Sequence, residues 1–214
     1  MKPYITLKKS AQDEFTEKKS RFIGFAAPCR TEEEALSFLS SVRESNREAR
    51  HIAYAYIIGD NFSTMRFSDD GEPGGTAGMP MLEILKTRKI CYAAVAVVRY
   101  FGGILLGAGG LTRAYSHAAA LAVKASGEVM MTPSARLILS CPYQMWDKLQ
   151  YQLALLPVIP ESPEYTSEVR TSIIVRADDR DSVANSIVNQ TNGSVVPSLS
   201  ETMYYKWDIE SVDE

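Results

Sequence analysis

An acidic, glycine-rich segment, FSDDGEPGGTAGMP at residues 67–80, contains several side chains that could do chemistry. Three carboxylates fall within four positions, Asp69, Asp70 and Glu72, and carboxylates can ligate Mg²⁺, accept a proton or pair with a cation. The glycines and Pro73 indicate a loop rather than the interior of a helix or strand. The spacing is not that of an EF-hand. The alternative to a ligand-binding loop is a solvated Asp-Gly turn that caps the following helix.

A second glycine-rich segment, FGGILLGAGG at residues 101–110, follows an apolar strand and opens a helix. Free amides at a helix N-terminus favour anions, so this segment could cradle a phosphate. It matches neither the P-loop nor the G-x-G-x-x-G pattern, and the alternative is a tight turn where helix and sheet pack closely. The candidate ligand- or partner-binding residues of the two segments, besides the three acids, are Gly74, Gly75, Thr76, Gly102, Gly103, Gly107, Gly109 and Gly110.

Basic residues are placed where they could meet these segments. Arg99 ends an apolar strand just before the second segment, where its guanidinium could reach a phosphate or the acids, most directly Asp69 or Asp70. His51 follows Arg50 at the start of another strand, and it is either a ligand-binding group or a hydrogen-bonded structural one. We include Arg50, His51 and Arg99 in the candidate site.

A basic patch precedes the first long apolar strand. Lys18, Lys19 and Arg21 could contact RNA phosphates in a salt-dependent manner, or they could form a solvated sheet edge. The formal charge is −3 for the whole chain, but +3 for residues 1–133 and −6 for residues 134–214, so a nucleic-acid surface belongs to the first part. RNP-like aromatic strands and helix-turn-helix spacing are absent from the sequence, and we expect no sequence-specific DNA recognition.

Composition indicates a folded chain, because 45% hydrophobic residues with 23% charged ones is ordinary for globular domains. The longest apolar runs are too short to span a bilayer, and the first ten residues lack a signal-peptide core, so we expect a cytoplasmic protein without a membrane partner. Cys29, Cys91 and Cys141 are widely spaced and form no CxxC pair, which predicts buried, reduced thiols rather than a zinc site.

The pattern of apolar residues predicts alternating strands and helices. We expect strands at residues 20–29, 50–59 and 91–100, the last buried on both faces. Thr31 is predicted to cap one helix, Thr76 to cap a second, and Gly127 to end a third. The fold class is α+β in two domains, residues 1–132 and residues 133–214, joined near Pro133, which we expect to interrupt regular structure. The β-α-β-β-α-β order predicted for the second domain suggests a ferredoxin-like fold.

Four segments of the first domain carry a family resemblance. KKSRFIG, ARHIAYAY, FSDDGEPGGTAGMP and VVRYFGGILLGAGGLTRAY stand in this order between residues 18 and 115, and together they resemble the IMPACT (YigZ-type) family. The resemblance implies a ribosomal-protein-S5 domain 2-like fold for the first domain. The second domain is similar to the one seen in bacterial members, which looks like the fifth domain of elongation factor G.

The resemblance also implies a link to translation. Eukaryotic relatives restrain the starvation-response kinase by competing for its ribosome-associated activator protein, so the expected partners are the ribosome, RNA or a translation-associated protein. Three positions depart from the family pattern: Met79 stands where lysine is common, Gly75 where serine or alanine is usual, and Ile52 in place of a second histidine. Each departure removes a polar group, which favours binding over catalysis.

Two functions remain open at this point. The first is a translation-linked regulatory or binding protein that requires no cofactor. The second is a Mg²⁺-dependent phosphoryl-transfer or hydrolytic enzyme acting on a nucleotide or small phosphate substrate, in which Asp69, Asp70 or Glu72 would hold the metal or act as base. No catalytic residue is assigned, because the second segment contains no lysine and no clear serine partner.

Overall fold

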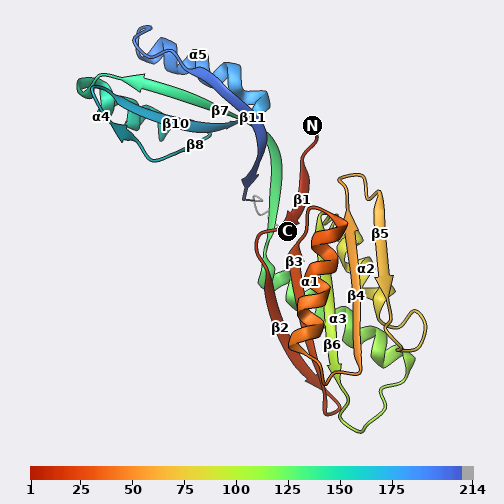
Figure 1. Ribbon diagram of the computed structural model, residues 1–214. Helices are drawn as coiled ribbons and strands as arrows, with labels where there is room; N and C mark the ends of the chain where they lie inside the picture. The colour runs from red at the N-terminus through yellow and green to blue at the C-terminus, as the bar shows by residue number, and fades with distance from the viewer. Residues whose placement is uncertain (209–214) are drawn as a thin grey trace. The chain divides into compact units, whose positions relative to one another are not determined.

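The computed structural model describes residues 1–208, which form two compact units (Figure 1). The N-terminal unit is built on Tyr4–Met130, and the C-terminal unit consists of Met131–Trp207 together with Met1–Pro3. Both units combine helices with antiparallel sheet, as the α+β expectation states. The candidate site lies within the N-terminal unit.

The N-terminal unit has a five-stranded sheet in the order β2-β3-β6-β4-β5, and every neighbouring pair is antiparallel. Helix α1 covers one face, whereas α2 and α3 cover the other (Figure 1). The central strand β6 is therefore buried on both faces, as its apolar sequence predicts. The elements are β1 (Tyr4–Leu7), β2 (Ala11–Glu17), β3 (Ser20–Pro28), α1 (Glu32–Ser45), β4 (His51–Ile58), β5 (Thr64–Ser68), α2 (Gly78–Thr87), β6 (Ala93–Tyr100) and α3 (Ala108–Ser126).

The ends of these helices test the predicted caps. The Thr31 hydroxyl accepts a hydrogen bond from the Glu34 amide at 3.2 Å, so the predicted cap of α1 is confirmed. Gly127 ends α3 with a φ of 69°, also as predicted. The prediction for Thr76 is wrong. Helix α2 begins at Gly78, and the Thr76 hydroxyl instead donates to the Pro73 carbonyl at 2.7 Å.

The C-terminal unit has strands β7, β10 and β8 in this order, with β11 paired to β7 and β9 paired to β10. Helices α4 and α5 pack on one face of this sheet around a core that includes Leu149 and Ile187. Apart from the short extra strand β9, the predicted succession of elements is present. The elements are β7 (Glu128–Cys141), α4 (Tyr143–Leu153), β8 (Val158–Pro160), β9 (Glu164–Tyr165), β10 (Val169–Arg176), a 3₁₀ turn (Ala177–Asp179), α5 (Arg180–Gln190) and β11 (Ser198–Trp207).

Pro133 does not interrupt regular structure, contrary to the prediction. Strand β7 runs through it, and the division between the units falls inside the same strand. The pairing of β7 with β10 begins at Ser134, so the missing amide of Pro133 removes no hydrogen bond from that ladder.

Two close backbone approaches fix the glycine-rich segments in the N-terminal unit. A Cβ atom on Gly102 would lie 2.0 Å from the carbonyl carbon and oxygen of Lys19, and a Cβ on Gly78 would lie 2.7 Å from the Ser68 carbonyl oxygen. Because only glycine has no Cβ, only glycine permits this packing. The second glycine-rich segment therefore lies directly against the turn between β2 and β3.

Candidate anion-binding site

The centre of the candidate site is a buried arginine on the central strand. Arg99 lies near the end of β6, paired across the sheet with His51 of β4 and Phe22 of β3. Its Nη1 donates to Glu72 Oε1 at 2.7 Å. The Tyr115 hydroxyl, from α3, donates to the same carboxylate oxygen at 2.8 Å. A buried guanidinium needs a counter-ion, and Glu72 of the first glycine-rich segment supplies it.

All three members of this network are buried. Arg99 and Glu72 are each 8% exposed and Tyr115 is 0% exposed. Burial, followed by the neighbouring Glu72 carboxylate, raises the pKa of the Tyr115 hydroxyl far above its ordinary value. Tyr115 is therefore a donor at every physiological pH. The predicted pairing of Arg99 with Asp69 or Asp70 is wrong, because both of those carboxylates hold backbone amides.

Asp69 caps helix α2 from a distance in sequence. Its Oδ2 accepts from the Gly75 amide at 2.8 Å, and its Oδ1 accepts from the amides of Ala77 at 2.9 Å and Gly78 at 2.8 Å. Burial alone raises the pKa of this carboxyl, but the three amide bonds together outweigh it, so the pKa is lowered. The alternative interpretation of the acidic segment, an Asp turn that caps a helix, is correct for this residue.

Asp70 orients the histidine of the candidate site. Its backbone carbonyl accepts from His51 Nδ1 at 2.7 Å, and its Oδ2 accepts from the Ile52 amide at 2.7 Å and from Arg43 Nη2 at 3.0 Å. Because a carbonyl oxygen only accepts hydrogen bonds, the ring proton of neutral His51 is on Nδ1. The nitrogen left for a ligand is therefore Nε2, an acceptor in the neutral ring.

A cavity of about 460 Å³ opens beside Arg99. The Nε atom of Arg99 is buried and has no hydrogen-bond partner within residues 1–208. The guanidinium carbon lies 5.3 Å from the centre of the Phe101 ring and 5.6 Å from that of Phe22. The buried guanidinium thus has one unsatisfied N–H donor. The cavity is lined by Glu48, Arg50, His51, Arg99, Tyr100, Phe101 and Leu105.

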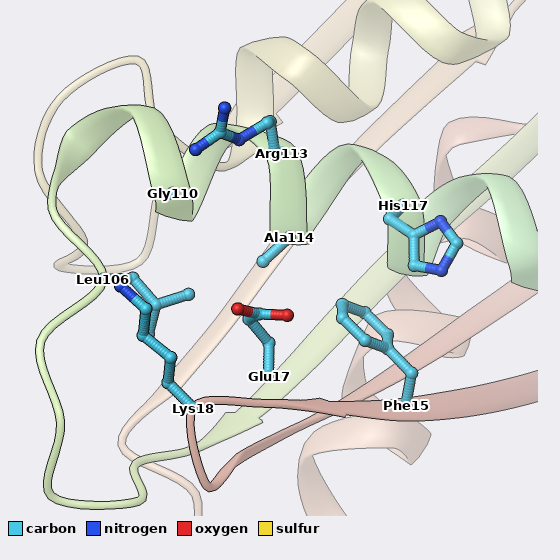
Figure 2. Close-up of a pocket in the computed structure, with 8 residues that line it drawn as sticks. All are labelled: Phe15, Glu17, Lys18, Leu106, Gly110, Arg113, Ala114 and His117. Carbon is cyan, nitrogen blue, oxygen red and sulfur yellow. The ribbon is translucent and has the colours of Figure 1, made fainter.

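A second cavity, of about 390 Å³, lies between the β2–β3 turn and α3 (Figure 2). In Figure 2 the Glu17 carboxylate lies between Lys18 and the ring pair of Phe15 and His117, with Arg113 above it. The His117 and Phe15 rings pack edge to face, with their centres 4.7 Å apart. The charged groups here are exposed, so this cavity lacks the buried unsatisfied donor of the first.

Comparison with known proteins identifies the family. The model of the Impact N-terminal domain matches residues 18–123. A Bacillus subtilis protein, IMPACT family member YvyE, is 32% identical over 211 residues, which are 99% of this chain and 97% of that protein. This chain belongs to the IMPACT family.

Two further similarities concern other IMPACT proteins and solved structures. IMPACT family member YigZ of Escherichia coli is 43% identical over 128 residues, covering 59% of this chain and 63% of that protein. A crystal structure described only as that of a hypothetical protein is 31% identical, covers 94% of this chain and 98% of its own, and superposes with a TM-score of 0.60.

The remaining predicted residues of this IMPACT chain have separate positions. Arg21 donates from Nη2 to Glu14 at 2.6 Å and lines neither cavity, whereas Lys18 lines the second cavity and the Lys19 backbone packs against Gly102. Of the predicted glycines, Gly110 lines the second cavity, and the exposed ones are Gly74, Gly75, Gly103, Gly107 and Gly109.

Sequence reasoning missed five residues of the site: Glu48, Tyr100, Phe101, Leu105 and Tyr115. Tyr115 carried a signal, because its hydroxyl stands on an otherwise apolar helix face with Leu111, Ala114 and Ala118, where a polar group needs a partner. Tyr100 is the last residue of strand β6, and Glu48, Phe101 and Leu105 are ordinary loop residues.

The structure also bears on the predictions about cysteine and metal sites. The three cysteines are free and buried, as predicted, and burial raises the pKa of Cys29 and of Cys91 to about 11, so these thiols stay protonated. Within residues 1–208 there is no group of three or more His, Cys, Asp or Glu side chains arranged to hold a metal ion. None of the helices in this part of the chain is long and apolar enough to cross a membrane.

Proposed function

We propose that this protein is a translation-linked binding protein of the cytoplasm that contacts RNA, the ribosome or a translation-associated protein through an anionic group bound beside Arg99. The family resemblance supports the link to translation. The observation that carries the proposal is the buried, unpartnered Nε–H of Arg99, a residue that lines a cavity together with Arg50 and His51.

The energetics favour an anion at this place. An unsatisfied buried donor costs about 1–3 kcal/mol, and a phosphate or carboxylate oxygen that accepts from Nε removes this cost. The Arg99 guanidinium cannot turn away easily, because Glu72 holds its Nη1 at 2.7 Å. Arg50 is exposed at the rim and adds positive charge, whereas Glu48 opposes it. The site thus combines one buried donor, the Nε–H of Arg99, with a rim where the charge of Arg50 is opposed by that of Glu48.

The enzymatic alternative has less support from the site. Asp69 holds three backbone amides, Asp70 holds Ile52 and Arg43, and Glu72 holds Arg99 and Tyr115. These contacts use the acids as structural groups. A nucleotide with Mg²⁺ should therefore leave the melting temperature unchanged, and a clear rise would favour the enzyme.

We also propose the finer fold assignments that the resemblance implies, with the boundary between residues 132 and 133. The strand order β7-β10-β8, the pairing of β11 with β7 and the β-α-β-β-α-β succession support a ferredoxin-like C-terminal domain. The helices on both faces of an antiparallel sheet are compatible with an S5 domain 2-like N-terminal domain.

Co-sedimentation with ribosomes and with total RNA across a salt series tests the proposed function. Arg99→Lys keeps a positive charge beside Glu72 but removes the Nε donor, and Arg50→Ala removes a rim charge. Both should weaken binding, and Arg50→Ala should reduce the salt slope by about 1 if it contacts a phosphate. Glu48→Gln should strengthen binding, since it removes a negative charge from the rim.

The matched control is Lys148→Ala, an exposed lysine on α4, which should change nothing. Wild-type protein that fails to sediment at any salt concentration, or binding that is indifferent to both arginine changes, would overturn the proposal.

A further inference from the structure

We infer that the ligand of this site is single-stranded RNA, which crosses residues 101–106 with a base stacked on Phe101 and phosphates in the two cavities on either side. The inference rests on the proposed function and names the ligand class. It follows from an exposed apolar ridge between two cavities that each contain cationic side chains.

The ridge is formed by large apolar side chains that the fold leaves exposed to solvent. Phe101 is 54% exposed, Ile104 41% and Leu105 82%. Leu105 lines the cavity of Arg99, and its neighbour Leu106 lines the cavity of Lys18 and Arg113. One short segment therefore separates two sites that each contain cationic groups. Proteins that bind single strands combine such a positively charged path with aromatic rings on which bases stack.

The Phe101 ring is held in place by a charged neighbour. The Arg99 guanidinium carbon lies 5.3 Å from the ring centre, within the range of a cation–π contact. Because Arg99 is anchored to Glu72, the ring is fixed on one side while much of it stays in contact with solvent. A base that stacks on the ring would bring its own phosphate into the cavity that Arg50 and Arg99 line.

The second cavity supplies cations for a neighbouring phosphate. Lys18 and Arg113 outnumber the single acid, Glu17, among its charged groups. Lys18 and Lys19 have φ angles of 45° and 64°, in the left-handed region that non-glycine residues rarely adopt. The two-residue connection between β2 and β3 requires positive φ at both positions, so the hairpin itself accounts for these angles. The turn places the Lys18 ammonium at the second cavity (Figure 2).

A single strand fits these features better than a duplex does. In a duplex both faces of each base are already stacked, so no base face is free to meet Phe101. A cavity of about 460 Å³ is also in the range that holds a small ligand such as one nucleotide. In the tautomer with the proton on Nδ1, His51 has Nε2 as an acceptor, which a ribose 2′-hydroxyl can use and a deoxyribose cannot.

Fluorescence anisotropy with the full chain tests the inference. The probes are an oligouridine of about ten nucleotides, the matching oligodeoxyuridine, duplex RNA of the same length, and uridine monophosphate as competitor. Oligouridine should bind more tightly than duplex RNA and than its deoxy counterpart. Phe101→Ala should weaken oligouridine binding about tenfold, and Phe101→Trp should preserve it.

Two further variants separate the ridge from the cavities. Tyr151→Ala removes an exposed aromatic ring from α4 and should have no effect. The double change Lys18→Ala and Arg113→Ala should weaken oligouridine but not uridine monophosphate, which is too short to reach both cavities. Duplex RNA binding as well as the single strand, or Phe101→Ala binding as well as wild type, would overturn the inference. Equal binding of the deoxy probe would overturn the assignment to RNA.

Failure of this inference can be told apart from failure of the proposed function. If ribosome association depended on Arg99 but the protein did not bind oligouridine, the proposed function would stand and the result would point to a protein partner. If the protein showed neither ribosome association nor oligouridine binding, the proposed function and the inference about the ligand would both be wrong.

Discussion

Arg99 and Glu72 form a buried ion pair in which one guanidinium nitrogen is satisfied and another is not. Nη1 lies 2.7 Å from the Glu72 carboxylate, with side chains 8% and 4% exposed, while Nε has no partner in the described residues 1–208. The pair therefore has two consequences. It holds the first glycine-rich segment on the sheet, and it fixes the guanidinium with one N–H donor left unsatisfied.

Removal of Glu72 should destabilise the N-terminal unit strongly. Glu72→Ala leaves the Arg99 charge buried without a counter-ion, and breaking such a pair costs about 3–5 kcal/mol. Tyr115→Phe keeps the pair and removes one hydrogen bond to a charged group, at a cost of about 1.5–3 kcal/mol. Urea unfolding of each variant measures the difference, and equal costs would show that the ion pair adds nothing to the hydrogen bond.

The Asp69 cap should make stability depend on pH in the acid range. The folded carboxyl has a lowered pKa, so its contribution is complete above the unfolded pKa of about 3.9 and is lost as pH falls through the lower folded pKa. Asp69→Ala should cost about 0.5–2 kcal/mol at neutral pH, as loss of a helix-capping side chain does. The deficit should shrink as the pH falls below about 4. Melting temperatures of both proteins across this range measure it, and a constant deficit would contradict the assignment.

Two glycines of the second segment should respond in opposite ways to alanine. Gly102→Ala places a Cβ 2.0 Å from the Lys19 backbone, so it should lower the melting temperature and displace residues 101–106. Gly109, in the first turn of α3, has open space around its Cβ position and no positive φ. Gly109→Ala should therefore stabilise the protein by about 0.4–1 kcal/mol. Calorimetry of the two variants gives the comparison, and similar losses for both would refute it.

The β2–β3 turn should be more stable with residues suited to its backbone. Lys18 and Lys19 form a two-residue connection in which both φ angles are positive, a geometry that favours Asn-Gly. The double change Lys18→Asn and Lys19→Gly should raise stability by about 1–2 kcal/mol and weaken oligouridine binding. A thermal melt together with the anisotropy assay checks both effects, and a variant that gains stability without losing affinity would show that the lysines are not contacts.

Local sequence was sufficient to predict most elements of the fold. Thr31 precedes an acidic first turn, Gly127 follows the last apolar turn of α3, and the run of small apolar residues in β6 required cover on both faces. These signals act over a few residues, since they arise from backbone conformation, capping and apolar periodicity. The segments with the family resemblance also included Arg99, His51 and both glycine-rich loops.

Two predictions from local sequence, the Thr76 cap and the break at Pro133, were wrong. Thr76 has the chemistry of a cap, but Asp69 reaches the first amides of α2 from seven residues before Thr76 and binds three N–H groups. Pro133 suggested a break, but its missing amide falls just outside the β7–β10 ladder. Neither outcome follows from residue type, because each depends on the exact direction of one backbone group.

The sequence by itself determined which residues could serve the site: three acids in one loop, one arginine at the end of an apolar strand and glycines on either side. Tertiary structure alone decided that Glu72, and not Asp69 or Asp70, meets Arg99 and Tyr115, and that Phe101 remains exposed beside them. The physical reason is that a loop turns its neighbouring side chains in different directions. Which carboxylate is buried depends on the packing of strands β6 and β4 with helix α3, which local sequence signals do not specify.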